Sequence, residues 1–303
     1  MIYFSCTGIY PRKERKKTVA IPETKALKQY NLIGDSIYYH HFRTEAAGEE
    51  YLHPSEVHTA HELLLLLEGE ISYMIEGEVY TAGPGDMIFV APGEVHSIRI
   101  GGEKPYERLV LLFDIGVLER LMQELKVHLN AFAYDGENRL HILPRALVQR
   151  YGLDVLLFDI LETEDEDRYK RILIMSKLLS FIIRTDKLIA AHKDELLALG
   201  ERDPFVRAVI TYVSTHIAEP IRLDTLASQL FVSKSTLCHR FAKAMHMTTN
   251  RYITVKKMNL AADMMRKGKT AAEAAAAVGY DNYTSFFYNF KRLMGKPPQA
   301  LTR

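Results

Sequence analysis

The stretch IRLDTLASQLFVSKSTLCHRFAKAMHM (221–247) has the pattern of two short helices joined by a tight turn. The apolar side of the first helix consists of Leu223, Leu226, Ala227 and Leu230. A turn over residues 231–233 follows, and Ser233 is suited to cap the next helix because its hydroxyl can accept a hydrogen bond from a free N–H of the first turn. In that helix Leu237 and Phe241 lie four residues apart and face inward, which leaves a polar outer face. This arrangement is what insertion of a helix into the major groove of DNA requires.

The same pattern returns after a connecting helix. The segment NRYITVKKMNLAADMMRKGKT (250–270) predicts one long helix that stops at Gly268. The segment AAEAAAAVGY (271–280) predicts a short helix ending at Gly279, and Asp281 or Asn282 then caps a helix over 283–294. The inward residues of this last helix are Phe286, Phe287 and Phe290. The sequence therefore predicts two helix-turn-helix units in tandem.

Charge is distributed unevenly along the chain. Residues 201–303 carry 16 lysines and arginines against 7 acidic residues, whereas residues 1–200 carry 23 against 31. A basic block on an acidic body is typical of a polyanion-binding protein, although a solvated helical surface would give the same excess. The block begins with a charged linker, 201–204, whose proline is suited to start the predicted helix 204–217.

The region 205–303 resembles the DNA-binding domain of the AraC/XylS family of transcription regulators. The resemblance is carried by LASQLFVSKSTLCHRFAK (226–243) and by GYDNYTSFFYNFKRLMGKPPQALTR (279–303), with its Gly-aromatic pair, its polar cap and its closing Gly, Pro and Arg. It implies two recognition helices that enter successive major-groove segments, roughly 34 Å apart. The alanine run 271–277 stands where the family has a bulky aliphatic residue, which predicts loose packing there.

Matching the recognition helices position by position assigns the contacts with double-stranded DNA. The base-reading residues would be Ser235, Cys238 and His239 in the first helix and Tyr283, Thr284 and Tyr288 in the second. The phosphate contacts would be made by Lys234, Arg240, Lys243, Lys291 and Arg292. Few of these side chains make the two-pronged base contacts of arginine or glutamine, so apolar contacts and DNA shape are expected to contribute to readout. Any single position in this set also has the plainer interpretation of an exposed polar residue.

The N-terminal half has the sequence pattern of short β-strands. From about Ile37 to Phe113, apolar and polar residues alternate between turns such as Glu76-Gly77, whereas residues 1–30 show no clear period. Segment 56–98 resembles the cupin barrel found in front of many AraC-type DNA-binding domains, most specifically in its Gly85-x6-Pro92-Gly93-x2-His96 element. We therefore expect an antiparallel cupin-like barrel that senses a small molecule.

Several polar residues are expected inside this barrel. By strand parity Glu56, His58 and Glu62 share a face, His96 could approach from a neighbouring strand, and His61 points away. Three interpretations remain open: an effector pocket, purely structural polar residues, or a metal site formed by Glu56, His58, Glu62 and His96. The expected effector-binding residues are Arg43, which could pair with an anion, and His58, Glu62 and His96.

A helical connector is predicted between the two parts, with helices at 117–129, 145–161 and 165–198. In the last of these the apolar stripe comprises Ile172, Met175, Leu178, Leu179 and Ile182. This stripe could pack on the barrel or form the helix–helix seam of a homodimer. The fold class is thus multi-domain α+β, with a cupin-like domain at 1–114, a helical connector and dimerisation region at 115–202 and an all-α DNA-binding domain at 203–303.

The remaining features exclude several classes of protein. The longest apolar stretches are too short to cross a membrane, and the apolar residues of the N-terminus precede the basic ones, so a cytoplasmic protein is expected. Two cysteines, Cys6 and Cys238, are too few for a disulfide framework or a zinc-thiolate site, and neither suits a DNA-repair methyl acceptor.

The predicted function is a ligand-responsive transcription regulator, expected to be an activator and not an enzyme, with no cofactor. The resemblance implies a sugar or sugar acid as effector and RNA polymerase as a partner. The alternative is a metal-dependent cupin enzyme with an appended DNA-binding tail.

Overall fold

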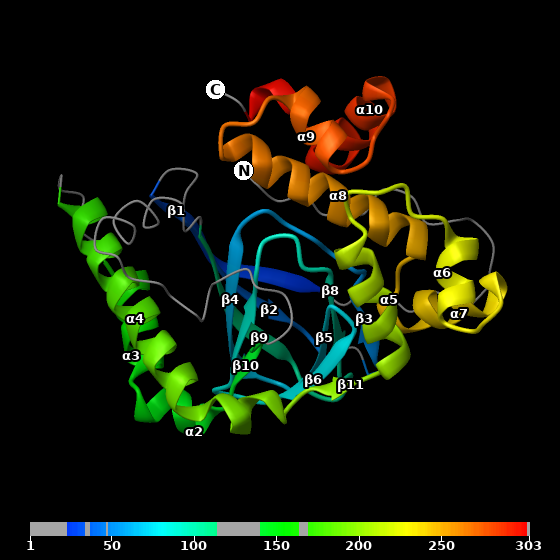
Figure 1. The fold of residues 1–303 in the computed structure, drawn as a ribbon. Helices are drawn as coiled ribbons and strands as arrows, with labels where there is room; N and C mark the ends of the chain where they lie inside the picture. Colours follow the sequence, from blue (N-terminus) through cyan, green and yellow to red (C-terminus); the bar gives the residue numbers. More distant parts are fainter. Residues whose placement is uncertain (1–22, 34–36, 47, 114–139, 164–168, 302–303) are drawn as a thin grey trace.

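The computed structural model in Figure 1 describes residues 23–33, 37–46, 48–113, 140–163 and 169–301. Two facing β-sheets form the N-terminal part, three helices cover one sheet, and further helices make up the C-terminal part (Figure 1). The predicted α+β fold class is confirmed. The predicted helix at 117–129 lies outside the described residues.

Both sheets are antiparallel, with strand orders β1-β2-β9-β4-β7-β10 and β11-β6-β5-β8-β3. The strands of the first sheet are β1 (Thr24–Ile33), β2 (Ile37–Thr44), β4 (His61–Glu68), β7 (Met87–Val90), β9 (Tyr106–Phe113) and β10 (Ile142–Leu143). Those of the second are β3 (Tyr51–Leu52), β5 (Ile71–Ile75), β6 (Glu78–Ala82), β8 (His96–Ile100) and β11 (Glu201–Arg202). Because the described strands leave an edge at each end of each sheet, the cupin-like domain is a pair of facing sheets and not the closed barrel that the sequence predicts.

The run of five leucines in β4 is explained by burial on both of its faces. Leu64 and Leu66 face the second sheet and pack between the two sheets, with Tyr73 of β5. Leu63 and Leu65 face the other way, into the core that the first sheet shares with the helices. Two of the strands, β10 and β11, come from the region predicted to be a helical connector, so this region also completes the sheets.

Three helices cover the outer side of the first sheet: α2 (Arg145–Arg150), α3 (Leu153–Leu161) and α4 (Lys170–Leu197). The helix predicted over 145–161 is two helices, because the chain turns at Tyr151 and Gly152. The predicted stripe of α4 is divided. Leu178 and Ile182 are buried in the core shared with the sheet, whereas Ile172 is 65% exposed.

The C-terminal helices follow the predicted order closely. They are α5 (Pro204–Thr215), α6 (Leu223–Gln229), α7 (Lys234–Met245), α8 (Thr249–Arg266), α9 (Ala271–Ala277) and α10 (Tyr283–Met294), followed by the 3-10 turn η1 (Pro298–Ala300). We call α6 and α7 the first unit and α9 and α10 the second unit. The N-terminal half of α8 packs on the first unit through Tyr252 and Ile253, and its C-terminal half packs on the second through Met258 and Met265.

The loop before α6 also meets the end of the second unit's α9 directly beside α8. A Cβ added to Gly279 would lie 2.7 Å from the carbonyl oxygen of Ala218, so only glycine allows this approach. Lys257 of α8 donates to the main-chain carbonyls of Glu219 and Val278, both at 2.7 Å. This buried lysine thus bridges the chain before α6 and the end of α9.

The facing sheets contact the C-terminal helices through the β5–β6 turn. In this turn the carboxylate of Glu76 accepts hydrogen bonds from the hydroxyl of Tyr252 and, at 3.2 Å, from Nζ of Lys256. A Cβ on Gly77 would collide with the side chain of Val206 of α5. The hydroxyl of Ser55 donates to the carbonyl of Met245 at 2.8 Å. Among the described residues, no helix is both long enough and apolar enough to span a membrane.

Candidate nucleic-acid interface and effector cavity

The first unit presents α7 on a fixed scaffold. Ser233 caps the helix by accepting a hydrogen bond from the amide of Thr236, as the sequence predicts. Leu237 and Phe241 are fully buried, and the ring of Phe241 lies 5.3 Å from that of Tyr252 on α8. The opposite side of α7 therefore faces solvent.

The second unit repeats this construction. Thr270 and Glu273 form a reciprocal capping box at the start of α9, and Asn282 caps α10 by accepting from the amide of Ser285. Phe286 and Phe290 are fully buried, whereas Phe287 is only partly buried.

The expected loose packing of the alanine run is not found. Ala274 and Ala275 are buried against α8, because their small side chains let α9 approach that helix closely.

The predicted contact residues on α7 lie mainly on its exposed face. Ser235, His239 and Lys243 are exposed, whereas Cys238 is partly buried against the core and lies at the flank. The two other basic residues of this set have partners within the chain. Nζ of Lys234 lies 2.9 Å from Asp224, and the guanidinium of Arg240 lies 3.9 Å from the ring centre of Phe205 and 3.7 Å from Asp203.

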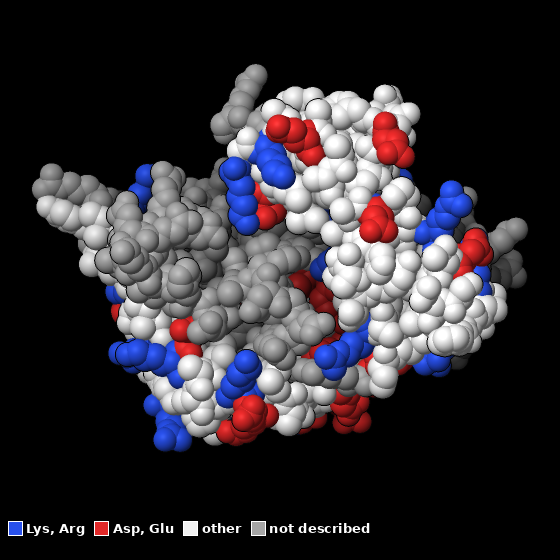
Figure 2. Space-filling view, in the orientation of Figure 1, with Lys and Arg blue, Asp and Glu red and all other residues white. Residues whose placement is uncertain are grey.

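On α10, Thr284, Tyr288, Lys291 and Arg292 are exposed, and Tyr288 is 67% exposed. Tyr283 lies at the flank, since its ring is 5.9 Å from that of Phe286 and its hydroxyl accepts a hydrogen bond from Gln299. Figure 2 shows that basic and acidic side chains are interspersed on the visible face of the helical units.

A cavity of about 350 Å³ lies between the two sheets. Its polar lining residues are Thr24, His40, Thr44, Tyr51, His53, Glu56, Glu62, Tyr73, His96, Ser97, Tyr106 and Arg108. The apolar ones are Phe42, Pro54, Ile98, Ile100 and Val110. Glu62 and His96, both predicted effector-binding residues, therefore line the same cavity. Glu56, predicted only as a ligand of the alternative metal site, lines it as well. The strands of Glu62 and His96 approach from opposite sheets.

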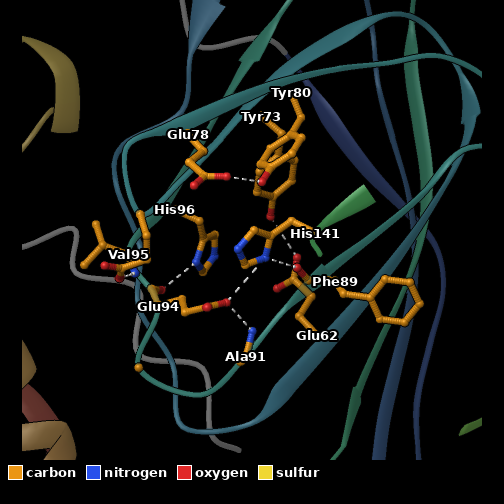
Figure 3. Close-up of polar contacts among 12 residues, drawn as sticks. Glu62, Tyr73, Glu78, Tyr80, Phe89, Ala91, Glu94, Val95, His96 and His141 are labelled. Atoms are coloured by element: carbon orange, nitrogen blue, oxygen red, sulfur yellow. Dashed lines mark hydrogen bonds and ion pairs between the residues drawn. The ribbon is translucent and has the colours of Figure 1, made fainter. Parts of the chain in front are cut away.

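Buried hydrogen bonds surround Glu62 and His96, two residues of the cavity wall (Figure 3). The hydroxyl of Tyr73 donates to Glu62 at 3.0 Å. Nδ1 of His96 donates to the carbonyl of Glu94 at 3.0 Å, and the Glu94 carboxylate accepts from the amide of Ala91 at 2.7 Å. Nδ1 of His141 donates to the carbonyl of Phe89 at 3.0 Å. The tautomer of His96 is thereby fixed, with Nε2 as its acceptor.

Glu62 and His58 form a buried ion pair, with Nε2 of His58 at 3.0 Å from the carboxylate. Burial opposes the charge on both groups. The hydrogen bond and charge of His58 nevertheless lower the pKa of Glu62 to about 2, and those of Glu62 raise the pKa of His58. Burial and the charge of His58 lower the pKa of His96 to about 4, so this ring is neutral at pH 7.

The donor set of His58, Glu62 and His96 fits a divalent metal ion. Their ligating atoms lie within 4.8 Å of one another. Nδ1 of each histidine donates to a main-chain carbonyl, which leaves both Nε2 atoms as ligands on the side of Glu62. Two imidazoles and a carboxylate suit an iron- or manganese-like ion, which would replace the proton shared by His58 and Glu62. Glu56 lines the cavity but does not belong to this group.

Two expectations about the cavity need correction. Glu56, His58 and Glu62 do not share one strand, because β4 begins at His61 and Glu56 forms an isolated bridge with His96. Arg43 lies outside the cavity, where it pairs with Glu68 at 2.6 Å and Glu107 at 2.5 Å.

The arginine that lines the cavity is Arg108 of β9. Tyr106 and Ser97 line it too, and none of these three residues was predicted. Tyr106, Arg108 and Val110 alternate along one strand and so share a face, a pattern from which Tyr106 and Arg108 could have been predicted. His61 points away from the cavity as predicted, and its ring stacks on Phe113 at 5.4 Å.

Acid should destabilise the fold through His40. Burial lowers the pKa of this cavity residue from 6.5 to about 4, so the unfolded chain binds a proton more readily than the folded one. Stability is therefore lost as the pH falls from 6.5 to 4, by about 3 kcal/mol for this residue. Denaturant unfolding at several pH values should show a flatter acid limb for His40→Gln than for the wild type. The exposed His239→Gln serves as control, and equal slopes in all three proteins would contradict the prediction.

Two family models match the chain. One, described as an AraC-like ligand binding domain, matches residues 38–182, and one described as a helix-turn-helix domain matches residues 226–303. An AraC-like transcription regulator from Streptomyces lividans is 31% identical over 122 residues, 40% of each chain. The HTH-type transcriptional regulator GbdR from Pseudomonas aeruginosa is 26% identical over 102 residues, 33% of this chain and 28% of GbdR. The matched segments thus span two fifths or less of these relatives.

Similar solved structures include apo ToxT from Vibrio cholerae, at 13% identity and a TM-score of 0.39 over 88% of this chain and 97% of that one. The C-terminal domain of AraT, a response regulator from Geobacillus stearothermophilus, is 27% identical with a TM-score of 0.33, over 33% of this chain and 85% of that one. The family matches follow one another along the chain, the ligand-binding domain over the facing sheets and the helix-turn-helix domain over both units. The chain therefore belongs to the AraC family.

Proposed function

We propose that this protein is a transcription regulator that binds double-stranded DNA with α7 and α10. The observation that carries the proposal is the pair of capped helices, each buried on one side and polar on the other, attached to a single helix α8. The facing sheets contact Met245, near the end of α7, and lie near Leu293 and Met294 of α10, so they leave the polar faces of both helices uncovered.

The exposed residues divide into two roles. Ser235, His239, Thr284 and Tyr288 would read base edges, with Cys238 and Tyr283 contributing from the flanks. Lys234, Arg240, Lys243, Lys291 and Arg292 would contact phosphates. A base contact discriminates between sequences, whereas a phosphate contact strengthens binding to every duplex.

Selection of bound duplexes from a random pool, followed by gel shifts with the full chain, tests this proposal. We expect His239→Ala and Tyr288→Ala to weaken binding to the selected site by roughly 5-fold to 150-fold, as the loss of a base contact does. Lys243→Ala should weaken all duplexes and reduce the salt slope by about 0.9. Lys187→Ala on α4 is the control. Failure to select any duplex, or variants that bind like the wild type, would refute the proposal.

We further propose that a small-molecule effector in the cavity controls DNA binding. His58 pairs with Glu62 at the cavity and also lies, with Val57 and Thr59, against Val255 and Asn259 of α8. A ligand that changes the position of His58 would alter the contact of the sheets with α8. For this to act as a switch, the ligand must bind the two arrangements with different affinities.

The partly exposed face of α4 supports a homodimer as the acting form. Ile172 and Ile183 are 65% and 38% exposed on this helix and are eleven residues apart, so they lie on the same side of it. Sedimentation of the wild type and of Ile172→Asp would test this. A wild type that sediments as a monomer at micromolar concentration would contradict it.

The cluster of three ligating atoms favours a second candidate, a metal-dependent cupin enzyme with a DNA-binding tail. A metal ion held by His58, Glu62 and His96 would supply Lewis-acid polarisation of a bound substrate. Metal analysis of the purified protein, with Glu62→Ala as control, separates the two candidates. Stoichiometric metal that is lost in the variant would favour the enzyme, and metal-free protein that binds DNA would remove it.

A further inference from the structure

Arg108 is the positively charged side chain of the cavity wall that has no carboxylate partner. Its guanidinium lies 4.4 Å from the ring centre of Tyr106 and 5.4 Å from that of Phe42, and it donates to the hydroxyl of Thr44 at 2.9 Å. No carboxylate of the described residues lies within ion-pair distance of it. Arg43, by contrast, is held by two glutamates outside the cavity. Arg108 is thus fixed in direction by its hydrogen bond and ring contacts, and Glu56 acts on its charge only from beyond ion-pair distance.

The carboxylates that line the same cavity have partners other than Arg108. Glu62 is paired with His58 and accepts from Tyr73. The carboxylate of Glu56 lies 3.6 Å from Nδ1 of His53. Neither group forms an ion pair with Arg108, and the negative charge of both carboxylates disfavours a ligand with two negative charges, such as a phosphate ester.

Two buried hydroxyls of the cavity wall also lack a hydrogen-bond partner among the described residues. They are the hydroxyl of Tyr106 and Oγ of Ser97, and these residues are only 1% and 3% exposed. Leaving a buried hydroxyl unpaired costs free energy, so such groups usually mark the place of a ligand or a water molecule. They come from opposite sheets, Tyr106 from β9 and Ser97 from β8, and so line both sides of the same space.

We infer that the cavity binds a small hydroxylated monocarboxylate, whose carboxylate pairs with Arg108 and whose hydroxyls bond to Tyr106 and Ser97. This inference rests on the proposed role of the cavity as the effector site. The volume of about 350 Å³ suits a ligand of roughly a dozen non-hydrogen atoms, on the about 30 Å³ that one water takes up in the liquid. A purely apolar acid would leave both hydroxyls unpaired, and an uncharged polyol would leave Arg108 without a counter-ion.

The test uses the full chain and a panel of six- and seven-carbon carboxylates with matched controls. Gluconate, glucuronate, galacturonate and quinate are each compared with the matching uncharged polyol or aldose, and hexanoate and inorganic phosphate complete the panel. We expect at least one hydroxylated carboxylate to raise the Tm, while its uncharged counterpart, hexanoate and phosphate do not. Arg108→Met should weaken that binding by roughly 30-fold or more, as the loss of a buried charge partner does. Arg43→Met should leave it unchanged.

Tyr106→Phe separates a ligand contact from a structural role. Because no described residue bonds to this hydroxyl, its removal should leave the Tm without ligand unchanged or higher, while binding weakens by roughly 5-fold or more. If Arg108→Met does not fold, Arg108→Lys takes its place and is expected to weaken binding by roughly 10-fold.

Binding of uncharged or apolar probes alone, no binding by any probe, or undiminished binding by the Arg108 variants would overturn the inference. The gel shift with selected DNA is measured in parallel. Retained DNA binding with no carboxylate effect refutes only this inference, whereas loss of DNA binding in the wild type refutes the proposed function.

Discussion

Lys257→Met is expected to lower the free energy of unfolding by about 2–4 kcal/mol and to abolish tight binding to a two-part DNA site. Nζ of Lys257 donates to the carbonyls of Glu219 and Val278, and the residue is only 5% exposed. Methionine fills a similar volume but leaves each carbonyl without a donor, at a cost of about 1–3 kcal/mol each. Removal of a charge from the interior offsets part of this loss, since burial lowers the pKa of Lys257.

Denaturant unfolding and gel shifts on the selected site measure both effects. Lys267→Met is the matched control, because this residue lies just beyond α8, is exposed and pairs only with Asp263. Lys257→Arg should restore part of the DNA affinity, because arginine can still donate to both carbonyls. If Lys257→Met unfolds and binds DNA like the wild type, the lysine does not fix the two units relative to each other.

Glu62→Gln is expected to lower the free energy of unfolding by about 3–5 kcal/mol, because it leaves a buried imidazolium without its counter-ion. The raised pKa of His58 contributes stability below 6.5 that is lost as the pH rises through its value in the folded protein. The lowered pKa of Glu62 contributes stability above 4.5 that is lost as the pH falls towards 2. The difference between wild type and variant should therefore be largest between pH 4.5 and 6.5.

Unfolding curves recorded with a chelator in the buffer isolate this ion pair from any bound metal. Glu68→Gln is the control, since Glu68 ends the same strand and pairs with Arg43, but its side chain is 43% exposed. We expect the control to change stability by about 1 kcal/mol or less. Equal and small losses in both variants would show that His58 and Glu62 are not held as a buried pair.

The helical half could be predicted from sequence almost residue by residue, because its signals are local. A hydroxyl or amide side chain before a helix, apolar residues four apart and a glycine after a short helix each act within one turn. Ser233, Asn282, Phe286 and Phe290 all lie where these rules place them. What the rules could not supply is the bridge from Lys257, because its acceptors are main-chain carbonyls distant in the sequence.

The cavity was predicted less well, because its wall depends on the pairing of strands. Segment 53–60 looks like the start of β4 by alternation, yet it is irregular and reaches His96 through one isolated bridge. Arg43 and Arg108 both lie on strands of the first sheet, and only their register decides which of them faces inward. In the edge strand β1, residues 24–29 are exposed on both faces and Leu32 is buried, so the strand carries no apolar period to recognise.

We expect α7 and α10 to read two successive major-groove segments on one face of the same duplex. Hydroxyl-radical footprinting of the full chain on its selected site tests this most directly. We expect two protected segments about one helical turn apart on one face of the duplex. One of them should be lost in His239→Ala and the other in Tyr288→Ala. A single protected segment, or two on opposite faces of the duplex, would contradict it.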